Sequence, residues 1–245
     1  MNEIQILDFD TKLFGFRVAK FTEKVLSSKI AEEIIIECKN MGIKCLYADL
    51  DINDFVSLSS AIKYGFVIAD IRVIFEKDLT NFKNSKEVKG NSYKIDANIK
   101  KADLPYLLTL SKEIACVSRF AFDGNFPKGS SEKLYTTWMI NSINGKAADR
   151  VFIAKEKETE KPIGVITCKE ESDRGEIVLV GVDKEYFGRG IASSLINHAL
   201  SFSKGNGFKK VRVVTQGNNI PAQRLYQKIG FSIYKISIFF HLWIE

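Results

Sequence analysis

Val180 to Ala192 reads V-G-V-D-K-E-Y-F-G-R-G-I-A and joins an apolar strand to a helix with apolar periodicity. Gly188, Arg189 and Gly190 fall at the junction. Glycine allows a tight bend and a close backbone approach to a ligand, because it has no Cβ. The first turn of a helix offers free N–H groups and a partial positive charge, which suit a phosphate. The stretch therefore predicts a site for a pyrophosphate-bearing cofactor; an ordinary strand-to-helix turn is the alternative.

A second motif follows downstream. Val211 to Thr215 reads as a strand, and Gln216 to Asn219 forms a polar, turn-rich stretch after it. Pro221 stands in the first turn of the next predicted helix, where its missing N–H costs little. That helix stops at Gly230, and a strand begins at Phe231.

The spacing N-x-x-A-x-x-L-Y-x-x-x-G-F, preceded by a strand, G-x-G and a helix, resembles the GNAT superfamily of acyl-CoA-dependent acyltransferases. The superfamily's first motif is written [QR]-x-x-G-x-[GA]. Gly190 and Ala192 fit this motif, whereas Phe187 occupies the Gln/Arg position. That position mainly offers a backbone group to the pyrophosphate. The resemblance implies a GNAT fold, which is α/β (α+β) with a mixed sheet, and acetyl-CoA as the co-substrate.

The resemblance also implies residue roles. The glycine loop and first helical turn would bind the pyrophosphate, while the strand edge at Leu179–Val182 would pair with pantetheine amides and polarise the thioester carbonyl. Tyr226 aligns with the family's proton donor to the CoA thiolate; a packed core tyrosine is the alternative. Asn219 is a helix cap, a contact to the pantetheine arm, or both. The expected cofactor-binding residues are Leu179, Val180, Val182, Gly188, Arg189, Gly190, Ile191, Ala192, Ser193, Asn219 and Tyr226.

Ser118 to Ser131 reads as a loop with one arginine and three phenylalanines. Arg119 is predicted to hold an acceptor phosphate or carboxylate through its rigid donor fork. Phe120, Phe122 and Phe126 are candidates to stack on a base or sugar, and the alternative is that these rings seal the core.

Other candidates for the acceptor side are less distinct. Gln216 follows a strand end, so it faces either the acceptor or solvent. No general base stands out, although Glu170 and Glu176 border the central strands and are candidates. Exposed strand-end carboxylates are the alternative reading of both.

The two halves of the chain resemble each other at an offset of 165 positions, which aligns Lys39 with Lys204 and Gly65-Phe66 with Gly230-Phe231. We therefore expect a partial, degenerate GNAT-like half at residues 1–78, a linker at 79–92 and a catalytic domain at 93–245; chance alignment is the alternative. Ala61 aligns with Tyr226, and Glu23-Lys24-Val25 aligns with the glycine loop. The first half should bind no CoA, and should support the core or wall the acceptor site.

The opening Asp8–Lys20, D-F-D-T-K-L-F-G-F-R-V-A-K, looks like that of the TDP-fucosamine (dTDP-4-amino-4,6-dideoxygalactose) acetyltransferases and their relatives. The closing Ile238–Trp243, I-F-F-H-L-W, continues that resemblance. It implies direct acetyl transfer, in a ternary complex, to a primary amine of a small molecule such as a nucleotide-linked 4-amino-deoxysugar. Acetylation of protein or peptide amines and a non-catalytic acyl-CoA sensor are the alternatives.

Composition limits the remaining classes. The net charge of +6 is not gathered into a basic run, which argues against nucleic-acid binding. The acidic N-terminal stretch has no apolar signal core, and no apolar run approaches the ~20 residues of a membrane helix. Four cysteines without a C-x-x-C pair and two distant histidines predict no metal site. We expect a cytoplasmic monomer or homodimer with no membrane partner.

Overall fold

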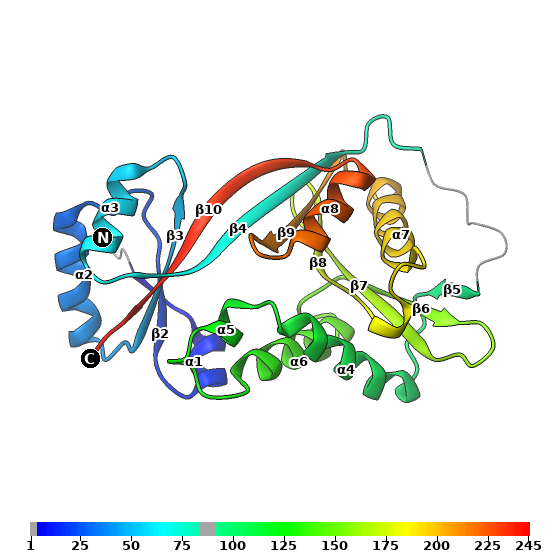
Figure 1. Ribbon diagram of the computed structural model, residues 1–245, viewed down its shortest axis with the longest axis horizontal. Helices are drawn as coiled ribbons and strands as arrows, with labels where there is room; N and C mark the ends of the chain where they lie inside the picture. Colours follow the sequence, from blue (N-terminus) through cyan, green and yellow to red (C-terminus); the bar gives the residue numbers. More distant parts are fainter. Residues whose placement is uncertain (1–3, 84–91) are drawn as a thin grey trace.

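The computed structural model describes residues 4–83 and 92–245, in which ten strands form one mixed sheet. The sheet order is β1-β2-β3-β10-β4-β9-β8-β7-β6-β5 (Figure 1). The strands are β1 (Ile4–Ile6), β2 (Val18–Phe21), β3 (Cys45–Asp51), β4 (Val67–Asp78), β5 (Tyr93–Asp96), β6 (Arg150–Glu156), β7 (Pro162–Glu170), β8 (Gly175–Val182), β9 (Lys210–Gln216) and β10 (Ser232–Trp243).

Helices cover both faces of this sheet (Figure 1). Apolar residues of α2, α3, α7 and α8 pack on one face, and those of α1, α4, α5 and α6 pack on the other. The helices are α1 (Asp8–Phe14), α2 (Ser28–Asn40), α3 (Phe55–Lys63), α4 (Leu104–Ala115), α5 (Arg119–Phe122), α6 (Ser130–Ile143), α7 (Ile191–Gly205) and α8 (Ile220–Ile229), with 3-10 turns η1 (Lys101–Asp103) and η2 (Lys184–Tyr186).

The α/β class and the mixed sheet expected from the sequence are confirmed. The segment 118–131 differs from the predicted loop, because α5 forms within it. Ser118 starts this short helix by accepting a hydrogen bond from the backbone N–H of Phe120. The predicted linker, residues 79–92, is only partly described, since 84–91 lie outside the described residues. Leu79 at its start is buried in the core.

The internal repeat is visible in the element bounds. β3 (45–51), the start of α3 (55) and β4 (67–78) recur 165 positions later as β9 (210–216), the start of α8 (220) and β10 (232–243). Even the irregularities match, because the register shift in the β4–β10 pair skips Ala69 on one strand and its counterpart Tyr234 on the other. The segments from β3 to β4 and from β9 to β10 therefore share the same order and spacing of elements.

The two halves exchange their last strands. β4 of the first half pairs with β9 of the second, and β10 of the second half pairs with β3 of the first. The registers correspond, since Arg72 lies opposite Gln216 as Ser237 lies opposite Asp51. β4 and β10 also pair with each other at the centre of the sheet (Figure 1). Each half therefore includes a strand of the other half in its part of the sheet.

The segment that follows β2 in the first half corresponds to the glycine loop of the second half, and it contacts α3. After β2, Leu26 is fully buried, and its backbone N–H donates to Ser57 Oγ on α3 at 2.7 Å. Ser57 is itself buried and corresponds to Ala222 in the repeat. The segment after β2 in the first half is thus hydrogen-bonded directly to α3.

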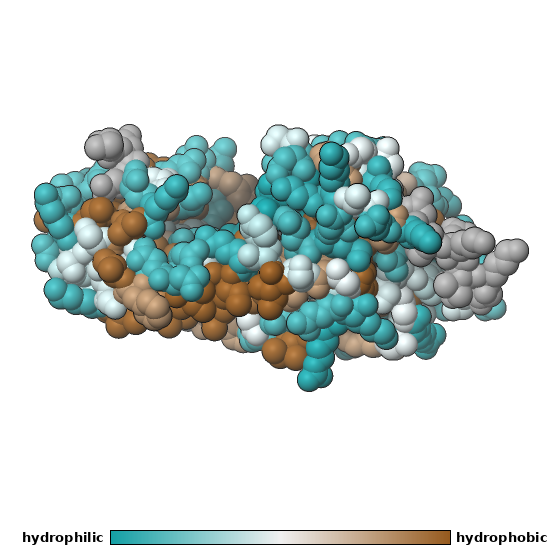
Figure 2. Space-filling model, turned by 90° about the horizontal axis from the view of Figure 1, so that it is seen from above, coloured by the Kyte–Doolittle hydropathy of each residue, from teal (hydrophilic) through white to brown (hydrophobic). Residues whose placement is uncertain are grey.

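Apolar side chains also reach the surface of the first half. Figure 2 shows a hydrophobic band toward the left and centre of the view from above. Phe55 and Val56 on α3 and Val67 and Ile68 on β4 are among the exposed apolar residues. These positions provide exposed controls for substitutions in the core.

Because the halves share strands, we expect a single unfolding transition that a core change in β4 shifts for the whole chain. Phe75 is fully buried, with its ring centroid 5.6 Å from that of Tyr226 in the second half. Phe75→Ala should lower the free energy of unfolding by about 3–5 kcal/mol. Urea denaturation followed by tryptophan fluorescence and by circular dichroism measures this.

Phe55→Ala is the matched control, because the Phe55 ring is 75% exposed and its loss should cost less than about 0.5 kcal/mol. Two separate transitions, or a Phe75→Ala midpoint equal to that of the control, would contradict the exchanged-strand core.

Candidate active site

A cleft opens where β8 and β9 separate. These strands pair in parallel only from Gly175–Val211 to Ile177–Val213, whereas β8 continues to Val182. On its other side, β8 shifts register against β7 so that Val178 is skipped. Such bulges re-aim the backbone and are common beside active sites. The β9-facing edge of β8 beyond Ile177 is therefore available to pair with an extended ligand.

The glycine loop leads from β8 into the N-terminus of α7. Gly188 and Gly190 both have φ of 77°, a left-handed conformation that L side chains rarely adopt. Gly190 is the N-cap of α7, and none of the described side chains caps the helix. The amides of Ile191, Ala192 and Ser193 in its first turn thus lack a capping acceptor. Such a helix start suits a pyrophosphate, and the cofactor site expected here from the sequence stays a prediction.

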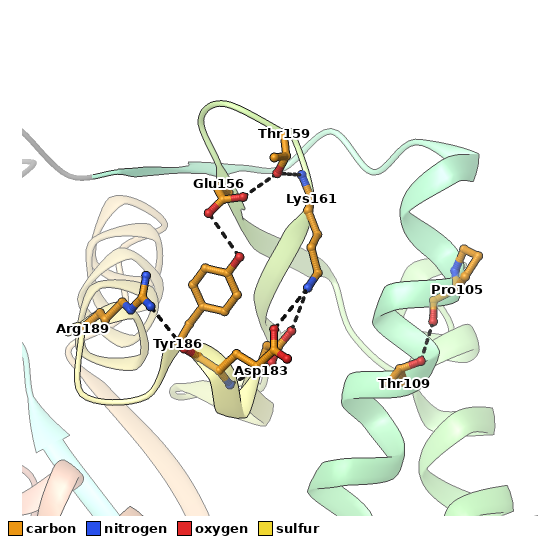
Figure 3. Close-up of polar contacts among 9 residues, drawn as sticks. Pro105, Thr109, Glu156, Thr159, Lys161, Asp183, Tyr186 and Arg189 are labelled. Atoms are coloured by element: carbon orange, nitrogen blue, oxygen red, sulfur yellow. Dashed lines mark hydrogen bonds and ion pairs between the residues drawn. The ribbon is translucent and has the colours of Figure 1, made fainter.

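Side-chain contacts fix the loop in place (Figure 3). The Tyr186 hydroxyl donates to Glu156 Oε1 at 3.1 Å, and the Arg189 guanidinium lies 4.8 Å from the Tyr186 ring centroid. Lys161 forms an ion pair with Asp183 at 3.3 Å. The loop is therefore tied to the end of β6 and to the turn between β6 and β7, while its glycines stay exposed.

The cleft widens into a cavity of about 610 Å³ that is lined from both faces of the sheet. Val180, Asn219 and Tyr226 belong to the α7–α8 side or to the β9–α8 turn. Arg119 and Tyr135 line it from the α5–α6 side. The cavity thus connects the predicted cofactor cleft with the helices of the opposite face. Its lining residues are Asp70, Arg72, Ile114, Val117, Arg119, Tyr135, Trp138, Lys146, Ala147, Lys169, Glu171, Glu176, Ile177, Val178, Leu179, Val180, Val213, Val214, Thr215, Gln216, Asn219, Tyr226 and Phe239.

Tyr226 stands between this cavity and the core. Its ring packs beside Phe75 at 5.6 Å and Phe231 at 5.8 Å between centroids, and the residue is 2% exposed. Burial raises the pKa of Tyr226, so the hydroxyl stays protonated at neutral pH. Packing and a donor role are thus compatible at this position.

Arg119 is a cation held by aromatic rings. Its guanidinium carbon lies 4.0 Å from the ring centroid of Phe239 and 4.3 Å from that of Phe120. Its Nε is buried with no hydrogen-bond partner among the described residues. Asp10 and Asp70 act on Arg119 through their charge, and neither forms an ion pair with it in the described part of the chain. The cavity is therefore lined by a guanidinium that forms no ion pair with a carboxylate of the described residues.

The other residues predicted for the acceptor lie in different places. Phe120 and Phe126 are buried and pack edge to face, with centroids 5.0 Å apart. The Phe120 ring also contacts the Arg119 guanidinium, and neither phenylalanine is among the cavity-lining residues. Gln216 ends β9 and lines the cavity. Asn219 also lines it, and its Oδ1 caps α8 by accepting from the Ala222 N–H at 3.3 Å.

Asp70 and Arg72 were not predicted, yet both line the cavity from β4 of the first half. Arg72 pairs with Asp49 at 2.9 Å. Burial raises the pKa of Asp70 to about 6, although the positive charge of Arg119 acts against this. The D-x-R pair within the apolar run V-I-A-D-I-R-V-I-F was the available signal. Only the strand exchange brings it to the cleft.

The two carboxylates named as candidate bases differ in position. Glu176 lines the cavity near the start of β8. Glu170 is exposed, accepts a hydrogen bond from the Asn206 side chain, and is not among the lining residues.

Comparison with known proteins gives a consistent picture for the second half. A model of the acetyltransferase (GNAT) family matches residues 118–231. The spore coat polysaccharide biosynthesis protein SpsD of Bacillus subtilis (strain 168) is 23% identical over 141 residues, covering 58% of this chain and 48% of that protein. This chain thus spans about half the length of that curated relative.

Solved structures match almost the whole chain. A GCN5-related N-acetyltransferase from Sphaerobacter thermophilus has a TM-score of 0.70 at 12% identity, covering 99% of this chain and 76% of that one. A tandem GNAT protein from the clavulanic acid biosynthesis pathway has a TM-score of 0.64 at 10% identity, with 93% and 75% covered. The chain therefore has the GNAT fold. Together with the family match, these findings support a GNAT superfamily acetyltransferase and are consistent with an acyltransferase.

None of the helices in residues 4–83 and 92–245 has the length and apolar character needed to cross a membrane.

A side chain at Gly190 should weaken CoA binding through the backbone. Gly190→Ala places a Cβ on a left-handed residue at the α7 N-cap, at a strain of roughly 1–2 kcal/mol, and relief of that strain would turn the first-turn amides away. We expect the CoA Kd, measured by calorimetry, to rise by about tenfold or more.

Gly207→Ala is the control, because Gly207 lies just beyond the other end of α7 with a similar φ of 86°. It should lower thermal stability about as much and leave the CoA Kd unchanged. Equal Kd values for both variants would contradict a pyrophosphate site at this loop.

Proposed function

We propose that the protein is an acetyl-CoA-dependent N-acetyltransferase that acts on a primary amine of a small molecule. The observation that carries this proposal is the cavity itself. It joins the free edge of β8 to Tyr226 on one face of the sheet and to Arg119 on the other. A thioester held along β8 and an amine entering from the α5–α6 side would meet inside it.

Each part of the site has a distinct task in direct transfer. The loop Gly188–Gly190 and the first turn of α7 hold the pyrophosphate of acetyl-CoA. The β8 edge at Leu179–Val182 pairs with the pantetheine arm, and a backbone N–H there stabilises the oxyanion that forms on the carbonyl. The amine nitrogen attacks the carbonyl carbon, the carbon–sulfur bond breaks, and Tyr226 donates its proton to the departing sulfur.

Arg119 selects an acceptor that carries an anionic group. A guanidinium fixed between rings offers its donors in one plane, which matches a phosphate or a carboxylate. An amino sugar linked to a nucleotide diphosphate, such as a TDP-linked 4-amino-deoxysugar, combines a primary amine with such a group. The N-terminal resemblance to TDP-fucosamine acetyltransferases favours the same class.

A CoA-release assay with acetyl-CoA and a panel of amines tests the proposal. The panel comprises TDP-linked 4-amino-sugars, UDP-linked amino sugars, free amino sugars, polyamines and N-terminal peptides. Release with an amino-sugar nucleotide is the expected result. Release with peptides alone would replace it with peptide acetylation, and CoA binding without release for any amine would favour an acyl-CoA sensor.

Tyr226→Phe should separate chemistry from cofactor binding. The phenyl ring keeps the packing against Phe75 and Phe231, while the proton donor is lost. We expect kcat to fall at least about tenfold, since general acids typically contribute ~10²–10⁴-fold, and the acetyl-CoA Kd to stay unchanged. An unchanged kcat would remove the donor role of Tyr226.

Arg119→Ala should raise the acceptor KM and leave the acetyl-CoA KM as in the wild type. Loss of a charge-assisted contact of about 1.5–3 kcal/mol corresponds to roughly 10–100-fold in KM. Arg119→Lys controls for the loss of charge, because it keeps the positive charge without the planar fork. Its acceptor KM should lie between those of the wild type and Arg119→Ala. If the acceptor KM of Arg119→Ala matches the wild type, Arg119 does not bind the acceptor.

A further inference from the structure

The acceptor amine enters a site that needs a proton acceptor. At neutral pH most primary aliphatic amines are ammonium ions, which have no lone pair for attack on a thioester. A carboxylate facing the incoming nitrogen would remove this obstacle. Two carboxylates on the sheet strands line the cavity, Asp70 and Glu176. They belong to different halves of the molecule.

The position of Asp70 distinguishes it. It lies on β4 opposite Phe239 and directly beside Ala69, which the register shift skips. Val73 and Phe75 of the same strand face the Tyr226 side, so Asp70 projects to the opposite face, where its charge acts on Arg119 and Tyr135. The carboxylate and the Tyr226 hydroxyl therefore approach the cavity from opposite faces of the sheet.

The surroundings of Asp70 leave its carboxylate available. Arg72 on its own strand is paired with Asp49, and Arg119 on α5 is held by aromatic rings. In the described part of the chain Asp70 has no ion-pair partner. Other titratable groups nearby are Tyr135 on α6, Glu176 on β8, and His241 on β10, which bonds Asp123 behind Arg119.

Burial raises the pKa of Asp70 to about 6, which brings this carboxylate closer to the operating range of a base at neutral pH. The backbone amides of Ile71 and Gly217 and the charges of Arg119 and Arg72 oppose the shift without cancelling it. Asp70 is thus ionised at pH 7 and holds a proton more firmly than an exposed aspartate.

We propose that Asp70, supplied by the first half through the exchanged strand β4, is the general base that takes the proton from the acceptor ammonium. This inference rests on the proposed function. The ammonium nitrogen loses one proton to Asp70, which passes it to solvent. Nitrogen then forms its bond to the carbonyl carbon, and the carbon–sulfur bond breaks. The second nitrogen proton replaces the one that Tyr226 gives to the CoA sulfur, so the products are amide, CoA thiol and one released proton.

The test compares the wild type with Asp70→Asn, using the amine of the panel that the wild type acetylates best. Below pH about 6 Asp70 is neutral and cannot accept a proton, so wild-type kcat/KM should rise with pH through this value. Asp70→Asn keeps the shape of the side chain but lacks the base. Its kcat should fall about 100-fold or more, and its profile should lack the step near pH 6.

Asp51→Asn is the matched control, because Asp51 lies on β3, which β10 separates from β4, pairs with Lys235 and is not among the cavity-lining residues. It should keep wild-type kcat and pH profile. A role limited to anchoring the ammonium would raise the acceptor KM of Asp70→Asn and spare kcat. That result, or loss of the acid step in Glu176→Gln instead, overturns this inference alone.

Absence of transfer by the wild type to any amine overturns the proposed function and this inference with it. Titration of the aspartate carboxyls by ¹³C NMR adds a measurement that needs neither acceptor nor turnover. A signal that titrates near pH 6 and is missing from Asp70→Asn is expected. An Asp70 signal that titrates in the ordinary range near 3.8 contradicts the inference.

Discussion

The antiparallel pairing of β4 with β10 is the interaction on which the rest of the structure depends. Each of these strands leaves its own half and completes the sheet of the other. The pairing of β4 with β9 places Phe75 in the core around Tyr226 and brings Asp70 of the same strand to the wall of the cavity. Without it, the cleft between β8 and β9 would have no strand on its acceptor side.

The two halves share the same order of strands and helices but differ at the end of their parallel strand pair. In the second half, β8 extends past its pairing with β9 and ends in a glycine loop, so a cleft remains between the two strands. In the first half, the backbone of Leu26 at the equivalent position is hydrogen-bonded to Ser57 of α3. Asp70 destabilises the fold at neutral pH, because burial makes its charged form less favourable. Its contribution to the free energy of unfolding falls as pH rises from 3.8 to about 6. Groups that destabilise the fold in this way are concentrated at functional sites.

Local sequence signals were sufficient for most of the second half. The glycine loop, the Asn219 cap and Pro221 follow from backbone requirements, and the strands and helices around them formed where the apolar pattern placed them. The repeat was also readable, because its offset is constant. The helix α5 was missed, since its single turn is set by the Ser118 cap rather than by periodicity. The acceptor side was harder to predict, because Phe120 and Phe126 are buried in the core and are not among the cavity-lining residues. Asp70 reaches the cavity only through long-range strand pairing.

The most direct measurement is a crystal structure of the chain with acetyl-CoA and the acetylated product of an accepted amine. We expect pyrophosphate oxygens on the amides of Gly188–Ser193, the sulfur beside the Tyr226 hydroxyl, and the product nitrogen facing Asp70 of β4. A cofactor bound elsewhere, or a product nitrogen turned away from β4 and held only by residues of the second half, would contradict a site built jointly by both halves.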